Sequence, residues 1–456
     1  MSPTPDRRAR LASRTGAVLR SPILLWGAFV LVHLWLGLLN LYAPGLPLGD
    51  VSIVYKFWTD QAIVANYWVG IDSSWVYPIV AILPMLAARA FGPGLYSGTW
   101  LSMIMLLDAV ALAAIVGWGR GRRHLGIGWW WLGFLALLGP IALGRIDSVT
   151  VPLAIVGVTM IASRPRIATV VLAVATWIKV WPAAIIGAMI VSLRERARVA
   201  AVAVLVSAAI VAIVLAIGGG LNVFSFVTQQ TGRGLQVEAP ITTAWLWQAV
   251  AGVPNTFVYY DQSILTWQVR GPGVEVASAL MTPLLALVLL AILVIAILAV
   301  RNGVAAADLL PTLSLAFVTA CIAINKVGSP QYMTWLAAPV ILGLATSATR
   351  RRISFRVPAI LVLVLAGLTQ VVYPYLYGWL LSLNVLMLVV LSARNVLLFV
   401  LLGWAVVVLW RLSRAPREDA VGEERGWLPV VWPLGLRESP EAARSDLDEP
   451  ALREPT

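Results

Sequence analysis

The 456-residue chain contains a single cysteine, Cys321, and only two histidines, His33 and His124. One thiol excludes an internal disulfide framework and a thiol metal site, and Cys321 lies in an apolar run, where a small residue packing between helices is expected. His33 lies inside an apolar run and His124 in an arginine-rich loop, so neither belongs to a group with metal-ligand spacing. We therefore expect no metal and no other cofactor.

Charged residues are also scarce, at 12% of the chain, compared with about a quarter in soluble domains. Hydrophobic residues make up 60%, and the mean hydropathy is +0.88. Apolar runs of about 20 residues, enough to span a bilayer, recur along most of the chain. The composition predicts an all-α polytopic integral membrane protein. Its first run, from Pro22 to Leu41, is too long for the apolar core of a secretory signal, so we interpret it as an uncleaved first helix.

The net charge of +12 comes mainly from arginines that cluster beside the apolar runs. Arginine clusters of this kind mark the cytoplasmic ends of membrane helices. Their placement excludes a nucleic-acid surface and predicts a plasma-membrane protein with both termini in the cytoplasm. The clusters lie within residues 7–10, 120–123, 194–196, 350–352 and 411–417.

Placing these clusters in the cytoplasm predicts about 11–13 transmembrane helices within residues 21–410, with larger external segments at about 43–94 and 219–272. Residues 1–20 would be a basic cytoplasmic N-terminus. Residues 411–456, rich in acids, proline and small residues, would be a disordered cytoplasmic tail. The expected crossings are 22–42, 95–118, 127–143, 148–163, two limbs within 167–193, 199–218, 273–300, 307–324, 332–347, 357–373 and 395–410.

Two places in this topology need comment. Lys179-Val180-Trp181-Pro182 interrupts the run at 167–193, which predicts a turn at the outer side because proline breaks a helix and lysine is costly in lipid. Near the other end of the chain, residues 379–392 are expected either to lie at the membrane surface or to cross.

Lysines are rare and unevenly placed. Only three of the 33 basic residues are lysines, Lys56, Lys179 and Lys326, and all three fall on the predicted outer side. Seven acids fall on or near that side as well. Ordinary solvated loop charge is the expected role for Asp60, Asp72, Asp261, Glu275 and Arg270. The seven acids are Asp50, Asp60, Asp72, Asp147, Glu238, Asp261 and Glu275.

Charges embedded in apolar helix ends are the stronger site candidates, because burying them costs free energy. Arg145 with Asp147, Lys179, and Asn325-Lys326 form this group. For Arg145 and Asp147 a structural helix-end ion pair is the alternative. For Lys56 the alternative is a side chain that extends to lipid headgroups.

One carboxylate and several cations at the outer membrane surface suit sugar transfer from a phosphate. A carboxylate can act as a general base on a hydroxyl group, and cations can stabilise a phosphate leaving group. Because a glycosyl phosphate already carries a good leaving group, the second carboxylate acid of most glycosidases is not needed. Aromatic residues near Tyr55 could stack on sugar rings, although an ordinary interfacial aromatic belt accounts for most of them.

Four stretches resemble membrane glycosyltransferases of the GT-C superfamily, and most of all glycosyltransferase family 87 (the DUF2029 group). The likeness covers about residues 20–410, and the family includes polyprenyl-phosphate-mannose-dependent mannosyltransferases. The stretches are Asp50 with Tyr55, Gly144-Arg145-Ile146-Asp147, Ile178-Lys179-Val180-Trp181-Pro182, and Asn325-Lys326-Val327-Gly328-Ser329-Pro330-Gln331-Tyr332 followed by Trp335.

The resemblance implies an inverting transfer with Asp50 as catalytic base and a lipid-phosphate donor bound from the outer leaflet. Val51-Ser52 follows Asp50 where many GT-C enzymes have a second acid, so a metal-free mechanism fits better. We expect the donor phosphate to contact Lys179, Lys326, Arg145, Gln331 and Arg233. The remaining substrate-binding candidates are Tyr55, Lys56, Asp147, Asn325 and Glu238.

The resemblance implies mannose as the donor sugar and an envelope glycolipid or lipoglycan as acceptor. The protein itself would be surrounded by membrane lipid. Arabinofuranose is an alternative donor sugar within the family. From other classes, a lipid or polysaccharide transporter or flippase and an O-antigen-type polymerase or ligase are the alternatives. A transporter would need inverted repeats and midplane charges, and Asp108 is the one clear acid in the middle of an apolar run.

Overall fold

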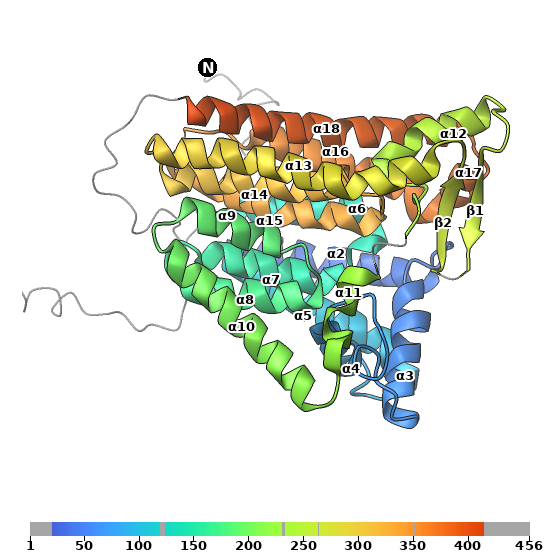
Figure 1. Cartoon of the computed structure of the whole chain (residues 1–456). Helices are drawn as coiled ribbons and strands as arrows, with labels where there is room; N and C mark the ends of the chain where they lie inside the picture. The colour runs from blue at the N-terminus through green and yellow to red at the C-terminus, as the bar shows by residue number, and fades with distance from the viewer. Residues whose placement is uncertain (1–20, 119–123, 230–232, 263, 351, 415–456) are drawn as a thin grey trace, which may run out of the picture.

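The computed structural model describes residues 21–118, 124–229, 233–262, 264–350 and 352–414 (Figure 1). The predicted N-terminus at 1–20 and the predicted tail from residue 415 onward lie outside these ranges. Residues 411–413, expected to begin that tail, belong instead to the last helix.

Nine helices within the described ranges are long and apolar enough to cross a membrane. Three shorter apolar helices accompany them, so the all-α, multi-pass architecture is confirmed, while the number that cross and their direction stay predictions. The nine are α2 (Pro22–Tyr42), α5 with its first turn (Pro93–Ile115), α6 with its last turn (Leu125–Ala142), α10 (Arg196–Ala216), α13 (Val274–Arg301), α14 (Ala306–Ala323), α15 with its first turn (Pro330–Arg350), α16 with its last turn (Arg356–Tyr375) and α18 (Val385–Ser413). The shorter three are α7 (Asp147–Met160), α8 (Pro165–Ile178) and α9 (Ala183–Ser192).

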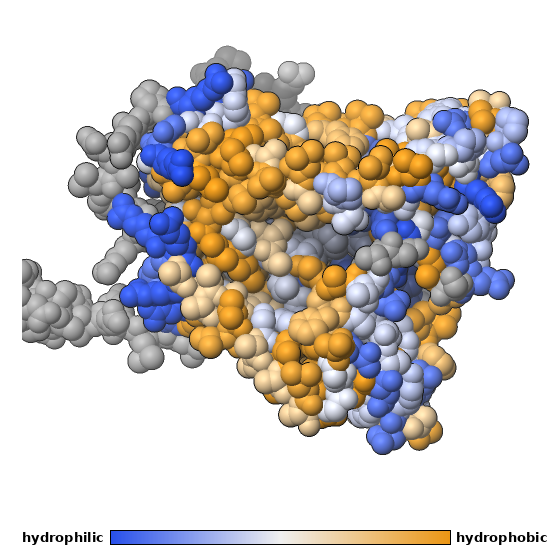
Figure 2. Space-filling view, viewed as in Figure 1, coloured by the Kyte–Doolittle hydropathy of each residue, from blue (hydrophilic) through white to orange (hydrophobic). Residues whose placement is uncertain are grey.

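The helices differ sharply in how much of their surface they bury. In α14, 94% of the span is buried, and this helix packs against α9, α13, α15 and α18 as the central element. In α10 and α13 only 11% and 17% of the span is buried. Figure 2 shows a hydrophobic band between hydrophilic ends, the surface expected of helices that face lipid.

The turn predicted at Lys179-Val180-Trp181-Pro182 is confirmed. Helix α8 ends at Ile178 and α9 begins at Ala183, so the four residues connect two short apolar helices. Because proline fits the first turn of a helix but not its interior, Pro182 is placed where α9 can start.

Residues 379–392, expected either to lie at the surface or to cross, are not a separate element. A short helix, α17 (Tyr377–Leu381), is followed by one continuous 29-residue helix, α18, so no boundary separates 385–392 from the span expected at 395–410. Arg394 and Asn395 lie within this helix, and both are buried. Arg394 donates a hydrogen bond to the Glu238 carbonyl and Asn395 to the Thr243 hydroxyl, so the second external segment satisfies them inside the helix.

The two segments predicted to be external, at about 43–94 and 219–272, contain the remaining helices and strands. The first contains a π-helical turn (Asp50–Tyr55), α3 (Lys56–Val64) and α4 (Ile82–Ala87). The second contains α11 (Ser225–Thr228), α12 (Thr243–Val250) and a hairpin that the all-α expectation missed. Its strands, β1 (Phe257–Asp261) and β2 (Thr266–Arg270), pair antiparallel with Phe257 opposite Arg270. Tyr259, Tyr260, Trp267 and Val269, all residue types common in strands, were the sequence signal.

Sequence reasoning also missed a buried pair between two spans. His33 Nε2 of α2 lies 3.0 Å from Asp108 Oδ2 of α5, and His33 Nδ1 lies 2.9 Å from the Phe29 carbonyl. An ionisable group within an apolar helix needs a partner nearby. His33 and Asp108, each inside a different apolar run, could therefore have predicted a contact between the two helices. The pair gives Asp108 a role in helix packing.

Candidate functional site

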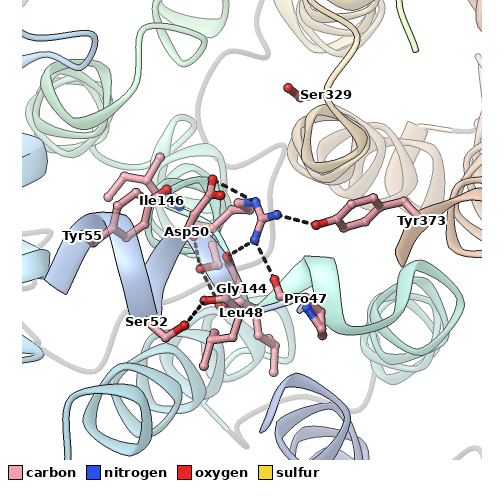
Figure 3. Close-up of polar contacts among 12 residues, drawn as sticks. Pro47, Leu48, Asp50, Ser52, Tyr55, Gly144, Ile146, Ser329 and Tyr373 are labelled. Carbon is pink, nitrogen blue, oxygen red and sulfur yellow. Dashed lines mark hydrogen bonds and ion pairs between the residues drawn. The ribbon is translucent and has the colours of Figure 1, made fainter. Parts of the chain in front are cut away.

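Asp50 starts the π-helical turn of the first external segment, directly after Gly49. Its Oδ2 lies 3.1 Å from Nε of Arg145, and 40% of its side chain is exposed, against 8% for Arg145. The carboxylate is therefore reachable from outside while the guanidinium behind it is buried. Figure 3 shows Asp50 and Tyr373 on either side of this group, with dashed lines for the contacts.

Arg145 lies at the junction between the end of α6 and the start of α7, and it binds three further groups. Its Nη1 donates to the Pro47 carbonyl at 2.6 Å and to the Gly144 carbonyl at 2.7 Å. Its Nη2 donates to the Tyr373 hydroxyl at 2.7 Å. Burial opposes its charge, but the Asp50 carboxylate and nearby tyrosines raise the pKa of Arg145. The arginine stays charged and is held in one orientation.

The alternative of an ion pair between Arg145 and Asp147 is wrong. Asp147 is 1% exposed and its Oδ1 accepts a 2.6 Å hydrogen bond from Nε1 of Trp335. Its Oδ2 has no hydrogen-bond partner among the described residues. Burial lowers the pKa of Lys179, but the Asp147 charge together with Tyr77 and Tyr332 outweighs it, and the pKa is raised. Asp147 is thus the counter-charge of Lys179 and is anchored by Trp335.

Two tyrosines connect Asp50's surroundings with Lys179. Tyr55 is buried, and its hydroxyl accepts a hydrogen bond from the Ile146 amide at 3.2 Å. It also lies 3.4 Å from the hydroxyl of Tyr77. The ring of Tyr77 has Lys179 Nζ 4.6 Å from its centroid, within the range of a cation–π contact. Two residues of the first external segment therefore connect the surroundings of the Asp50 carboxylate with Lys179.

Three of the five residues predicted to bind phosphate lie within electrostatic reach of one another. The charge of Arg233 lowers the pKa of Lys326, second to burial, and also opposes the charge of Lys179. Arg233 Nε is buried without a hydrogen-bond partner among the described residues. Like charges repel, so three cations kept this close favour binding of an anion.

Two of these cations, Lys179 and Lys326, line a cavity of about 330 Å³, and Arg233 acts on both through its charge without lining it. Its polar wall comes from the turn after α8 and the end of α14, with Lys179, Asn325 and Lys326. Its apolar wall comes from α11 and α13, with Phe226, Val227, Met281 and Leu285 among the lining residues. Figure 2 shows the hollow on the face between α13 and the α10–α11 region. One cavity thus combines positive charge with an apolar side that opens between lipid-facing helices.

Aromatic rings form another part of the cavity wall. Trp181 and Trp335 are stacked with centroids 5.7 Å apart, and Tyr332 stacks on Trp335 at 4.2 Å. All three line the cavity. The two motifs that hold them, at 178–182 and 325–335, are far apart in sequence but share one wall.

Some predicted residues lie elsewhere. Glu238 is buried, where a hydrogen bond to Tyr377 and the Arg394 contact occupy it, and burial raises its pKa. Among the described residues that line the cavity, Lys56 and Gln331 are absent. Asn325 does line the cavity, but it also caps the end of α14, with Nδ2 donating to the Cys321 carbonyl and Oδ1 accepting from the Val327 amide. The binding roles assigned to these residues stay predictions.

Tyr373 was missed by sequence reasoning. Tyr373 lies in the turn after α16, within Tyr373-Pro374-Tyr375-Leu376-Tyr377. Such an aromatic cluster at the end of a span is indistinguishable in sequence from an interfacial belt. The contact with Arg145 gives Tyr373 its significance.

Gly328 allows the Lys326 turn to approach the second external segment. A Cβ added there would lie 2.1 Å from the Ala239 nitrogen, and the Gln236 amide donates to the Lys326 carbonyl. We expect Gly328→Ala to lower stability by about 1–3 kcal/mol, the usual cost of overpacking. Thermal unfolding in detergent would measure it. Gly403→Ala is the control, because a Cβ there meets nothing within 4 Å. Equal unfolding temperatures for the two variants would contradict the close approach at Gly328.

No family model, curated protein or solved structure matches this chain. The family resemblance of the four stretches therefore stays a proposal, and the function has to be argued from the site.

Proposed function

We propose that this protein transfers a sugar, mannose in the first instance, from a polyprenyl-phosphate donor to an envelope glycolipid or lipoglycan. In this proposal it is a GT-C-type enzyme of family 87 that acts at the outer face of the plasma membrane. The observation that carries the proposal is the cationic cavity with an apolar side, connected through Tyr77 and Tyr55 to the turn that holds a half-exposed carboxylate.

The cavity suits an anion that bears an apolar chain. Lys179, Lys326 and Arg233 supply positive charge, and the α11–α13 wall supplies apolar contact. At about 330 Å³ the cavity is at the small end of ligand pockets, large enough for a phosphate and one sugar. The prenyl chain would lie outside it, along the lipid-facing surfaces of α10 and α13.

The reaction follows from the positions of base and cations. Asp50 takes the proton of the acceptor hydroxyl while that oxygen attacks the anomeric carbon of the donor. The bond from this carbon to the phosphate oxygen breaks, and the polyprenyl phosphate leaves with the electron pair. Lys179, Lys326 and Arg233 stabilise the negative charge that develops on the leaving phosphate. Attack opposite the leaving group inverts the anomeric centre.

The test is sugar transfer by purified protein in nanodiscs. Short-chain polyprenyl-phosphate-mannose is supplied with a bacterial membrane-lipid extract, and radiolabel in the lipid fraction is measured. Transfer supports the proposal and identifies the donor sugar. A parallel assay with polyprenyl-phosphate-arabinofuranose decides between the two donor sugars. No transfer from either donor would contradict the proposal.

The pKa of Lys326 gives a pH-dependence prediction. Burial and Arg233 lower this pKa, so the cation is lost at lower pH than an ordinary lysine. We expect affinity for a short prenyl phosphate to fall as pH rises from about 7 to 10, because Lys326 loses its positive charge. The phosphate itself does not change, since it is already fully ionised in this range. Lys326→Arg should remove the fall, since arginine keeps its charge. Titration by tryptophan fluorescence measures it, and an identical pH profile for both proteins would contradict the prediction.

A further inference from the structure

We infer that Arg145 acts on the base and not on the donor phosphate: together with Tyr373, it holds Asp50 in position for the acceptor hydroxyl. Both residues are positioning residues in this inference, which rests on the proposed function. It reassigns Arg145 from the phosphate-binding set.

The first argument is the number of hydrogen-bond donors that Arg145 has left. A guanidinium has five N–H groups in a fixed plane. Nε faces Asp50, Nη1 donates to two carbonyls and Nη2 donates to Tyr373. Four of the five are therefore engaged, whereas bidentate phosphate binding would need two free parallel donors.

The second argument is where Arg145 points. Of the described residues that line the cationic cavity, Arg145 is not one, although Lys179, Lys326 and Asn325 are. Its contacts connect the external turn at Pro47, its own junction at Gly144 and the turn after α16 at Tyr373. A Cβ at Gly144 would lie 2.8 Å from the Pro47 carbonyl, so these segments pack closely around the arginine.

The third argument is what the arrangement leaves for Asp50. Arg145 faces Oδ2, and for Oδ1 the described residues supply no ion-pair or hydrogen-bond partner. With 40% of the side chain exposed, that oxygen is open to a hydroxyl group. An arginine that fixes one oxygen and presents the other is a base-orienting device, since a catalytic group must be held to within a fraction of an ångström.

Several groups face the base. These are Arg145 from the α6–α7 junction, Tyr55 from the same turn and Tyr77 from the following loop, with Tyr373 acting through Arg145. Arg145 is the only cation in this set of described residues, so it alone pairs with the carboxylate.

The experiment compares Tyr373→Phe and Arg145→Gln with two controls. Tyr375→Phe is matched in chemistry, being the neighbouring tyrosine of the same turn, and Lys179→Met removes a cavity cation. Two readouts are taken in nanodiscs: binding of citronellyl phosphate by tryptophan fluorescence, and the separate values of kcat and of KM for the donor in mannose transfer. Tyr373→Phe covers the case in which Arg145→Gln does not fold.

We expect Tyr373→Phe to lower kcat about tenfold to a hundredfold while the KM for the donor changes little. Citronellyl phosphate binding stays unchanged in Tyr373→Phe and Arg145→Gln but weakens in Lys179→Met. Loss of binding in Arg145→Gln equal to that in Lys179→Met overturns the inference, as does a raised KM for the donor with kcat unchanged in Tyr373→Phe. Absence of both transfer and binding in the unmodified protein overturns the proposed function, and the inference with it.

Discussion

Replacing Asp50 by asparagine is expected to reduce kcat for sugar transfer about 10²–10⁴-fold, the contribution typical of a general base. The amide keeps the size of the carboxyl group but cannot accept the acceptor's proton at neutral pH. Donor binding should change little, because the cavity cations lie apart from this residue. The measurement is initial rate against donor concentration in nanodiscs.

Asp60→Asn is the matched control for this prediction. Asp60 belongs to the same external segment, its side chain is 38% exposed and it pairs with Arg89 at 2.7 Å. It therefore resembles Asp50 in exposure and in having an arginine partner, while no predicted site residue forms an ion pair with its carboxylate within the described ranges. Equal rates for Asp50→Asn and the unmodified protein would remove Asp50 from the mechanism. An equal fall in both variants would indicate a general effect of losing an external ion pair.

Lys179→Met is expected to weaken binding of a short polyprenyl phosphate about 10–150-fold, corresponding to the roughly 1.5–3 kcal/mol of a hydrogen bond to a charged group. Methionine keeps the apolar stem and removes the charge. Asp147, with one unpartnered oxygen, would then face the bound phosphate with its counter-charge gone, which adds repulsion. Fluorescence of Trp181 and Trp335, which line the same cavity, reports binding.

Arg270→Met is the control for net charge, because it removes one positive charge from the exposed end of β2, where no cavity residue lies. Its affinity should match that of the unmodified protein. If Lys179→Met also binds normally, the lysine is a structural counter-charge of Asp147 and the cavity's anion site is misassigned.

Most of the helical architecture could be predicted from residue order. Apolar runs as long as the bilayer is thick, separated by arginines, leave few solutions because the backbone in lipid must satisfy its own hydrogen bonds. The turn at Lys179–Pro182 was predictable for the same reason, since proline and lysine both disfavour a continuous span. The hairpin at 257–270 was overlooked because its strands lie in a chain otherwise dominated by helix signals.

Continuity of α18 depended on contacts that no local pattern contains. Arg394 and Asn395 are polar residues inside a long apolar helix, and Glu238 and Thr243, more than 150 residues earlier, accept their hydrogen bonds. The penalty for a polar residue in a helix depends on whether a partner is present, and partners come from the tertiary structure.

The candidate site divides in the same way. Residue types and positions along the chain made Arg145, Lys179 and Lys326 candidates, because charge in an apolar setting is costly wherever the helices lie, and the family resemblance added Asp50 as the base. The cost of burying a charge does not predict its partner: Arg145 faces Asp50 and Tyr373, while Asp147 contacts Trp335 and is the counter-charge of Lys179. Arg145 and Asp147, two positions apart, diverge because neighbouring side chains at the start of a helix point in different directions. Which charges form pairs depends on how distant segments pack, and this packing cannot be predicted from composition and spacing.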